Sequence, residues 1–573
     1  MSIEKKKRLY RAEIIPCERI RIMPASRVAF SIELIAYSLG VKMGDWHNIP
    51  NASDKLKWYQ NKGALKLNFF LSIIMVGMVL NGYDGTLISG LQAFDSWQED
   101  LNYPTGARLG LLNAAGCISG FVVGPIISYI DDTFGRRWGV RFYGYTIVIG
   151  TVISVIAGVS KVNGYAIFIC GRVIIGFGLA SFLMTSLVVV QEITHPRTRS
   201  IIAHSWNSYY ILGSVIASWV NFGCSYMTGS WAWRIPYLIQ LPMALYVLVA
   251  VQFVPETPRF LIDKGREEEA LAFLVELHGN GNPDDELVRF EFAEITTALS
   301  KEKEAKAEKW STVLRSRSNR YRLGLAALMT FLTVMSGSSI IYFYYSIVFT
   351  QVGITDPTTQ TGINAGLSVF TWFCQIAAVF IGKRVGRKTI VLWIWPCLFL
   401  ALIGLCAAGG VAAHQLDGGS SSVGVATVVL VWIYLGCFNA SNPVIYSYPA
   451  EIQTYSMRAK GLLVWNTVQQ LEGAYVTFVD AVALDSIGYK YYAVYLPLVA
   501  IQWVLCYYFM VETKGYTLEE IAIAFDGRSA LSTGVSSDTE IGPVERVDWD
   551  TRAINPDEDV EGDDKGKDLE VGK

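Results

Sequence analysis

The stretch LNFFLSIIMVGMVLNGYDGTLISGL, residues 67–91, is long and apolar, yet it carries a carboxylate, Asp84, near its end. About 20 predominantly apolar residues are enough for a helix to cross the ~30 Å hydrocarbon core of a bilayer. A charged side chain inside such a helix costs at least ~2.5 kcal/mol on insertion scales, so it needs a partner or a function. The stretch therefore predicts a transmembrane helix that holds an ionisable group.

The rest of the chain has the same apolar character. It has 573 residues, of which 52% are hydrophobic and only 17% charged, which is too apolar for an ordinary soluble protein. The apolar residues gather in blocks that predict twelve spans in two groups of six, and hence an all-α membrane protein. The first six lie near 67–91, 107–130, 140–159, 163–190, 201–222 and 235–254, and the second six near 323–350, 361–382, 389–413, 424–448, 460–483 and 490–511.

Polar segments separate and flank these two groups. The middle segment alternates charged and apolar residues at spacings that suit short surface helices, as in DKGREEEALAFLVELHGN at 263–280. The predicted domains are an N-terminal tail at 1–66, a six-helix bundle at 67–254, a helical linker at 255–322, a second six-helix bundle at 323–512 and an acidic C-terminal tail at 513–573.

Basic residues predict the orientation in the membrane, because cytoplasmic loops carry an excess of Lys and Arg. The motifs GRRWGVR (135–141), HPRTR (195–199), KRVGRK (383–388) and MRAK (457–460) fall on the same side as the basic stretch at 4–11. We therefore expect both termini and the linker in the cytosol.

The two groups of spans repeat each other at a nearly constant distance. FGRR at 134–137 corresponds to VGRK at 385–388, 251 positions later; Glu-x6-Arg at 192–199 to 451–458, 259 positions later; and PET at 255–257 to VET at 511–513, 256 positions later. The economical explanation is a duplicated six-helix unit. Such repeats are typical of transporters that move one half against the other around a site near the bilayer midplane.

Several motifs in the right order resemble the sugar porter family of the major facilitator superfamily across nearly all of residues 67–526. They are NGYDGTLISG, FGRR, GRVIIGFGLA, the Glu192/Arg199 pair, PETPRFLIDKG, YPAEIQTYSMRAKG and VETKGYTLEEI. WRIPYLIQLP, VGITDPTTQTGIN and DSIGYKYYAVY further resemble the fungal lactose permease-like and cellodextrin permease-like branch. The resemblance implies two pseudo-symmetric six-helix bundles and sugar transport by alternating access.

The resemblance also implies a role for Asp84. In proton-coupled relatives a first-span aspartate takes up the proton, and a fourth-span arginine adjusts the proton affinity of that aspartate. Asp84 and Arg172 match these positions. Pairing with arginine favours the ionised carboxylate whereas burial disfavours it, so a change of conformation can bind and release a proton. The alternative is a static structural ion pair. Gly82, Gly85 and Gly90 should let neighbouring helices approach the carboxylate closely.

Charged residues of the repeated loop motifs are candidates for gating, through ion pairs that break when the halves separate. We expect Arg136 and Arg137 to act with Asp132, and Glu192 with Arg199. The alternative is that these charges only set the topology. The full set is Asp132, Arg136, Arg137, Glu192, Arg199, Glu256, Arg387, Glu451, Arg458 and Glu512.

A sugar site needs amide side chains for paired hydrogen bonds and aromatic faces for packing. Each candidate could equally serve helix packing. The candidates are Asn207, Ser339, Tyr344, Trp372, Asn439, Asn442, Gln469 and Glu472, with Tyr342, Tyr345, Gln375 and Tyr446 as further ones.

The seventh span departs from the family. It reads TVMSGSS at 333–339, where relatives carry Gln and Asn around a glycine. In the eleventh span Glu472 replaces a small residue and Asp480 replaces Asn, and both fall on the helical face of Gln469. A second proton site or a non-sugar ligand would account for these changes.

The sequence supports three hypotheses. The first is a plasma-membrane, proton-coupled importer of a disaccharide or hexose, acting as a monomer in the lipid bilayer. The second is a carrier of the same fold for a polyol, an aromatic acid or a fungal secondary metabolite. The third, a non-transporting sensor, would predict a long signalling tail, and we do not expect it because the stretch after Asp526 is short and acidic.

An enzyme is not expected. The chain has no GxxxxGK[ST] loop for a nucleoside triphosphate, and its five histidines are scattered without metal or nucleophile spacing. We therefore expect no cofactor besides the proton gradient, no metal and no nucleic-acid partner.

Overall fold

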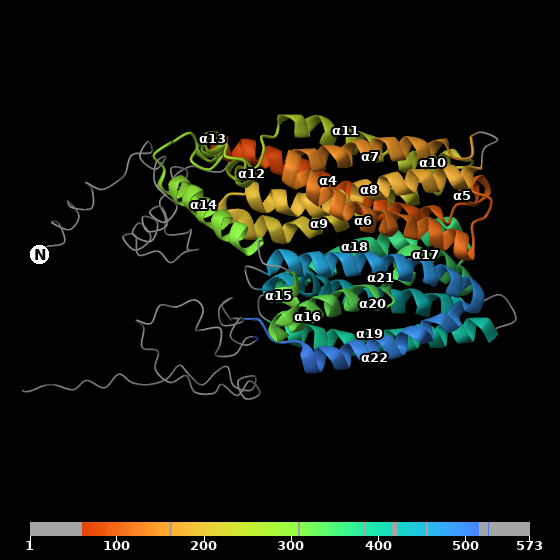
Figure 1. The fold of residues 1–573 in the computed structure, drawn as a ribbon. Helices are drawn as coiled ribbons and strands as arrows, with labels where there is room; N and C mark the ends of the chain where they lie inside the picture. The colour runs from red at the N-terminus through yellow and green to blue at the C-terminus, as the bar shows by residue number, and fades with distance from the viewer. Residues whose placement is uncertain are drawn as a thin grey trace, which may run out of the picture. The chain divides into compact units, whose positions relative to one another are not determined.

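The computed structural model describes residues 60–159, 163–306, 310–382, 385–414, 421–453, 457–514 and 525, and every regular element among them is helical (Figure 1). This confirms the predicted all-α fold class. The expectations for the tails at 1–59 and 526–573, and for Lys383 and Arg384 of the basic motif, lie outside the described residues.

The first helical group corresponds to the first six predicted spans. It consists of α4 (Lys62–Leu91), the short α5 (Asp95–Asp100), α6 (Gly106–Phe134), α7 (Arg136–Ile156), α8 (Gly164–Ile193), α9 (Pro196–Cys224), α10 (Trp231–Leu238), α11 (Gln240–Ala250) and η1 (Val251–Phe253). The predicted linker contains α12 (Pro258–Asp263), α13 (Glu267–Leu277), α14 (Glu286–Lys306) and α15 (Trp310–Arg315).

The second group corresponds to the other six predicted spans. It consists of α16 (Arg317–Val334), α17 (Ser338–Gln351), α18 (Pro357–Gly382), α19 (Arg387–His414), α20 (Ser421–Glu451), α21 (Arg458–Ile487), η2 (Gly488–Tyr491) and α22 (Tyr492–Phe509). We call the end of the bundles beside α12–α14 the linker end and the opposite end, beside α5, the distal end (Figure 1).

Nine helical stretches of the described residues are long and apolar enough to cross a bilayer, and Lys460–Phe509 among them covers two predicted spans. The remaining predicted spans correspond to α9 and α18, which are 29 and 26 residues long and therefore long enough to cross a bilayer. Both helices pack at the contact between the two groups, with α9 along α18. A helix buried among other helices can carry more polar side chains than one that faces lipid.

The seventh predicted span is broken, whereas the sequence predicted one continuous helix. Gly337 separates α16 from α17 with φ of 94°, a left-handed conformation that glycine adopts without steric cost. Tyr344 adds a kink inside α17, with φ of −133°. A break in a helix frees backbone groups and lets the chain change direction. As a result α17 is a separate short helix, and it lies at the distal end of the second group (Figure 1).

The two groups contact each other along α6 and α21 and along α9 and α18. Near the distal start of α6, a Cβ added to Gly110 would lie 2.7 Å from the backbone oxygen of Phe478 in α21. Asn364 Nδ2 of α18 donates to Ser218 Oγ of α9 over 3.3 Å. α17 also contacts α4. These contacts bring the halves together toward the distal end.

Candidate functional site

The ion pair expected from the sequence lies where α4 meets α8. Arg172 Nη1 donates to Asp84 Oδ2 over 2.7 Å, and the two side chains are 5% and 0% exposed. Asp84 Oδ1 is buried without a hydrogen-bond partner among the described residues. Loss of either partner would leave an uncompensated buried charge. The second carboxylate oxygen therefore keeps hydrogen-bonding capacity that none of the described residues uses.

Helix α9 approaches this pair because small residues line α4. A Cβ added to Gly82 would lie 1.7 Å from the backbone oxygen of Tyr210, and one added to Gly85 would lie 2.7 Å from the Tyr210 hydroxyl. Ser214 Oγ donates to the Gly82 carbonyl over 3.2 Å. Tyr210 also neighbours Asp84 and, from the other half, Tyr342. The ion pair thus lies close to the contact between the halves.

Several expected substrate residues gather on α20 and α21. Asn439 Nδ2 donates to the Tyr342 hydroxyl over 2.6 Å, and Asn442 Nδ2 donates to Asn439 Oδ1 over 3.3 Å. Gln469 Nε2 donates to the Tyr446 hydroxyl over 3.3 Å. The structure therefore joins candidates from spans seven, ten and eleven in one polar region of the second half.

Some candidate groups keep hydrogen-bonding capacity. Glu472 is half-buried, and its Oε2 has no partner among the described residues. The same is true of Asn442 Oδ1 and of the Trp372 indole nitrogen in α18. Asn207 is half-buried in α9. Because burying a polar atom without a partner is costly, such atoms favour a polar ligand as a partner.

Ser339 and Tyr344 differ from the expectation that they contact substrate. Ser339 Oγ donates to Asp480 Oδ2 over 2.5 Å, and the Tyr344 hydroxyl donates to the Thr477 carbonyl over 2.5 Å. Both partners belong to α21. The break at Gly337 turns the start of α17 toward α21, so both hydroxyl groups already have protein acceptors.

The expected site set omitted two buried amides, Gln92 and Asn113. Neither side-chain atom of either residue has a partner among the described residues, and the same holds for Gln240. Asn113 is 4% exposed in α6, and Gln240 is fully buried at the start of α11. For Asn113 and Gln240, an amide inside an apolar span was the available sequence signal, whereas Gln92 directly follows its span. These residues add donors and acceptors on the first half.

At the linker end, one group of charges fixes the turn between α6 and α7. Glu256 Oε1 accepts from the backbone nitrogens of Arg136 and Arg137 over 2.9 and 3.4 Å. Arg136 Nε lies 3.3 Å from Glu192 Oε2, whereas Asp132 is 64% exposed and 3.7 Å from Arg136 Nη1. Burial raises the pKa of Glu256, against the effect of the hydrogen bonds that it accepts. Glu192, rather than Asp132, is the close partner of Arg136.

The second half repeats this arrangement. Glu512 accepts from the backbone nitrogens of Arg387 and Lys388 over 2.8 and 3.0 Å, and Arg387 Nε donates to Glu451 Oε2 over 3.3 Å. The duplicated motifs therefore form the same contacts twice. Each of these sets lies within one half, whereas we expected ion pairs that break when the halves separate; this holds for the members whose side chains the structure describes. The side chain of Arg458 lies outside the described residues.

Arg199 also differs from its expected pairing with Glu192. It donates from Nη2 to Glu291 Oε1 of linker helix α14 over 3.0 Å. His278 Nδ1 lies 2.6 Å from Glu291 Oε2, and its Nε2 lies 3.1 Å from the Ile193 carbonyl. Both ring nitrogens of His278 therefore lie within hydrogen-bond distance of oxygen atoms. The turn at His195 directs Arg199 toward the linker, which sequence spacing alone did not indicate.

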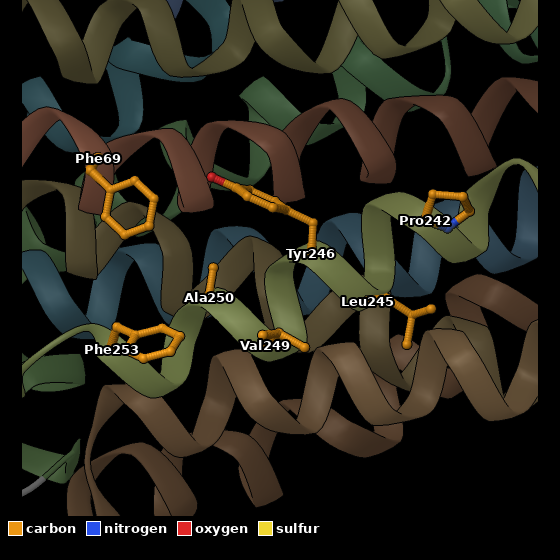
Figure 2. Close-up of a pocket in the computed structure, with 7 residues that line it drawn as sticks. All are labelled: Phe69, Pro242, Leu245, Tyr246, Val249, Ala250 and Phe253. Carbon is orange, nitrogen blue, oxygen red and sulfur yellow. The ribbon is translucent and has the colours of Figure 1, made fainter.

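A groove between α4 and α11 offers no alternative site for a polar ligand (Figure 2). It encloses about 380 Å³. Its lining is apolar apart from the hydroxyl of Tyr246, and that hydroxyl is hydrogen-bonded to Ser72 over 3.1 Å. Exposed apolar side chains such as Phe253 and Val249 suit contact with lipid.

Comparisons with known proteins agree with this architecture. The model of the family described as "Sugar (and other) transporter" matches residues 70–525. The low-affinity glucose transporter HXT4 of Saccharomyces cerevisiae (strain JAY291) is 24% identical over 466 residues, which cover 78% of this chain and 79% of that protein. A low-affinity glucose transporter of Kluyveromyces lactis is 25% identical over 489 residues, covering 82% of this chain and 84% of that protein.

Among solved structures, the inward-open xylose transporter XylE from E. coli matches with a TM-score of 0.65 at 20% identity, covering 80% of this chain and 99% of that one. The proton:xylose symporter XylE bound to 6-bromo-6-deoxy-D-glucose matches with a TM-score of 0.63 at 20% identity, covering 81% of this chain and 100% of that one. These matches confirm the major facilitator fold.

The match to a transporter family, together with two related helical halves, identifies a membrane transporter rather than an enzyme. The family match makes the class more specific: the chain belongs to the sugar porter family of the major facilitator superfamily.

Proposed function

We propose that this protein imports a sugar, a disaccharide or a hexose, together with protons by alternating access. The observation that carries the proposal is the buried Asp84–Arg172 pair, in which one carboxylate oxygen has no protein partner. An intramembrane ion pair is costly to keep unless it has a function. The proton:xylose symporter that shares this fold supports the same coupling.

The geometry suggests how the pair could couple the two events. A proton that adds to Asp84 Oδ1 neutralises the carboxylate, so its attraction to Arg172 falls. Arg172 then needs another acceptor, because a buried guanidinium without one is unstable. A movement that gives Arg172 a new acceptor or water would link proton binding to a change of conformation. Return of Arg172 would release the proton on the other side.

The sugar assignment rests on the polar groups around the contact between the halves. Amides such as Asn113 and Asn442 and the indole nitrogen of Trp372 can satisfy sugar hydroxyls, and each has an atom without a partner among the described residues. The similar yeast proteins are glucose transporters. The motifs of the lactose permease-like and cellodextrin permease-like branch favour a disaccharide.

A second candidate function is transport of a non-sugar molecule by the same fold. Thr333 Oγ1 donates to the Met329 carbonyl, and Ser336 and Ser338 bond to each other over 3.1 Å. The hydroxyl groups of the TVMSGSS segment thus already have protein partners, where relatives carry amides. Glu472 adds a carboxylate oxygen without a partner among the described residues. Both features depart from the amide-rich site that a sugar favours, so they support a ligand other than a sugar, such as a polyol, an aromatic acid or a fungal secondary metabolite.

The remaining parts of the proposal concern place and movement. We place the protein in the plasma membrane, as an importer requires, and the positions of the basic loops support cytosolic termini, so that the linker end faces the cytosol. We propose that the protein acts as a monomer. Each half would move as a unit, since Glu256 and Glu512 accept hydrogen bonds that hold the turns within one half.

Uptake of a panel of radiolabelled sugars into yeast that lacks its own transporters, with and without a protonophore, tests the proposal. We expect at least one disaccharide or hexose to accumulate, and the protonophore to abolish accumulation. Accumulation that resists the protonophore would contradict proton coupling. Failure with every sugar, together with uptake of a polyol or an aromatic acid, would favour the second candidate.

A further inference from the structure

A second carboxylate is fully buried in the other half of the molecule. Asp480 of α21 is 0% exposed and accepts three hydroxyl hydrogen bonds. Ser339 Oγ donates to Oδ2 over 2.5 Å, and the hydroxyls of Tyr491 and Tyr495 donate to Oδ1 over 2.8 and 2.6 Å. We call these four residues the Asp480 cluster. They come from α17, α21, η2 and α22.

The surroundings of Asp480 contain hydroxyl groups rather than a basic partner. Among the described residues no Lys, Arg or His forms an ion pair with it. The titratable groups facing it are Tyr491 from η2, Tyr495 from α22, Tyr344 from α17 and Tyr434 from α20. A carboxylate inside a membrane without a counter-charge is a candidate for proton binding. This environment differs from that of Asp84, which has a guanidinium.

The hydroxyl groups can serve either charge state of Asp480. In the ionised state all three donate to the carboxylate. In the protonated state the new O–H can donate to the Tyr495 oxygen, and the Tyr495 hydrogen can turn to the Tyr491 oxygen 3.4 Å away. Protonation therefore needs rotation of a hydroxyl and no displacement of a cation.

The cluster holds the broken seventh span in place. Ser339 lies in the first turn of α17, two residues after the left-handed Gly337. A Cβ added to Gly337 would lie 3.0 Å from the Tyr495 ring, so the break packs against the same cluster. Further along α17, the Tyr344 hydroxyl binds the Thr477 carbonyl of α21. Since α17 also contacts α4, its position affects the contact between the halves at the distal end.

We propose that Asp480 is a second proton-binding site, and that a proton bound there loosens α17 from α21 at the distal end. The proton comes from water at that end, where Lys490 of η2 is exposed beside Tyr491, and forms an O–H bond with Asp480. The Ser339 bond then changes from a charge-assisted bond to a neutral one, which is about half as strong. Deprotonation restores it.

The inference deepens the proposed function, because it rests on a carrier whose halves part at the distal end. It differs from proton coupling at Asp84, so the two can fail separately. The test therefore uses the full-length chain with Asp84→Asn, which removes the first carboxylate. Deuterium exchange of peptides that cover α17 is followed between pH 5 and pH 8, and each rate is divided by the intrinsic rate at that pH.

We expect the protection of α17 in Asp84→Asn protein to fall about tenfold from pH 8 to pH 5, as a charge-assisted hydrogen bond becomes neutral. Asp84→Asn/Asp480→Asn protein should show low protection at every pH. The matched control is Asp485→Asn, an exposed acid on the same helix, which should keep the pH response. A pH response that persists without Asp480, or no response in its presence, would overturn the inference.

Tyr495→Phe provides a test that leaves the acid in place, in case Asp480→Asn fails to fold. It removes one donor to Oδ1, so the ionised form loses support and the midpoint of the α17 response should move to higher pH. An unchanged midpoint would contradict the role of the cluster. Protonophore-resistant uptake alongside a normal α17 response would reject coupling at Asp84 while supporting Asp480 as a proton-binding site.

Discussion

At the scale of single residues, the two buried carboxylates illustrate two ways of keeping an acid inside a membrane. Asp84 has a guanidinium 2.7 Å away, whereas Asp480 has three hydroxyl donors. The guanidinium provides an opposite charge that stays fixed with pH, so a change at Asp84 must involve Arg172. Hydroxyl groups can rotate instead. We therefore assign long-range coupling to Asp84 and local control of α17 to Asp480.

The substitution Asp84→Asn should abolish accumulation of substrate against a gradient while leaving some exchange. The amide cannot take up the proton, but it preserves the size of the side chain. Concentrative uptake and counterflow in the same cells measure the two activities. Asp95→Asn, which alters an exposed acid at the distal end, is the matched control and should accumulate normally. Normal accumulation by Asp84→Asn would instead identify a static structural ion pair.

At the scale of helices, packing of α4 against α9 depends on the absence of a side chain at Gly82. A Cβ there would lie 1.7 Å from a backbone oxygen, which cannot move as a flexible side chain would. The linker helices show a different principle. Arg199 and His278 both contact the buried Glu291 of α14, so these contacts attach α14 and the end of α13 to the linker end of α8 and α9.

Gly82→Ala should destabilise the protein by on the order of 1–3 kcal/mol, because the added methyl group forces α4 and α9 apart. Gly223→Ala is the matched control, since a Cβ there meets nothing within 4 Å. That change should be neutral or stabilise the helix by up to about 1 kcal/mol. Thermal unfolding of the purified proteins in detergent compares them. Equal melting temperatures for the two variants would contradict this account of the packing.

Glu294 of α14 should make the linker less stable at alkaline pH. Burial raises its pKa to about 7, and repulsion from Glu291 adds to this, against the attraction of Arg199. A raised pKa gives a stabilisation that is complete below the ordinary pKa of 4.5 and is lost as pH rises through 7. Glu294→Gln should therefore raise the melting temperature at pH 8 and change it little at pH 5.

The control for this change is Glu267→Gln, which replaces an exposed acid in the first turn of α13. It should not reproduce the difference between pH 8 and pH 5. A Glu294→Gln variant that instead melts at the same temperature as the unaltered protein at both pH values would contradict the prediction. That result would show that ionisation of Glu294 does not lower the stability of the linker.

At the scale of the whole molecule, the halves meet toward the distal end, through α6 with α21 and α9 with α18. The contact between Asn364 and Ser218 joins α18 to α9 there. Alternating access requires such contacts to open once in every transport cycle. The charges at the linker end brace each half internally, so they fit rigid movement of the halves.

Replacing both Ser218 and Asn364 with cysteine should allow a disulfide that blocks transport. The side chains approach to 3.3 Å in the structure, which brings the two positions near the geometry that a disulfide needs. We expect an oxidant to stop uptake by the double variant and a reductant to restore it. Each single variant controls for reactions of the native cysteines. Unimpeded uptake by the cross-linked protein would show that this contact need not open.

Much of the fold followed from local patterns. Apolar blocks of sufficient length predicted the helices because the bilayer requires internal hydrogen bonding, and the repeated loop motifs predicted two related halves. The break at Gly337 was not predicted, since TVMSGSS remains apolar enough to continue a span. The candidate site was partly predictable. Asp84 and Arg172 were found because a charge in an apolar block is conspicuous, whereas the partners of Arg199 and Ser339 were not.

The sequence by itself determined the helical membrane fold, the duplication, the family and the two members of the ion pair, because each depends on residue type and spacing along one chain. Only the tertiary structure decided that Arg199 binds Glu291, that Arg136 binds Glu192 and that Asp480 receives three hydroxyl donors. Those contacts depend on the rotation and depth of helices that are distant in sequence. Packing against neighbours fixes both quantities, and no local pattern contains them.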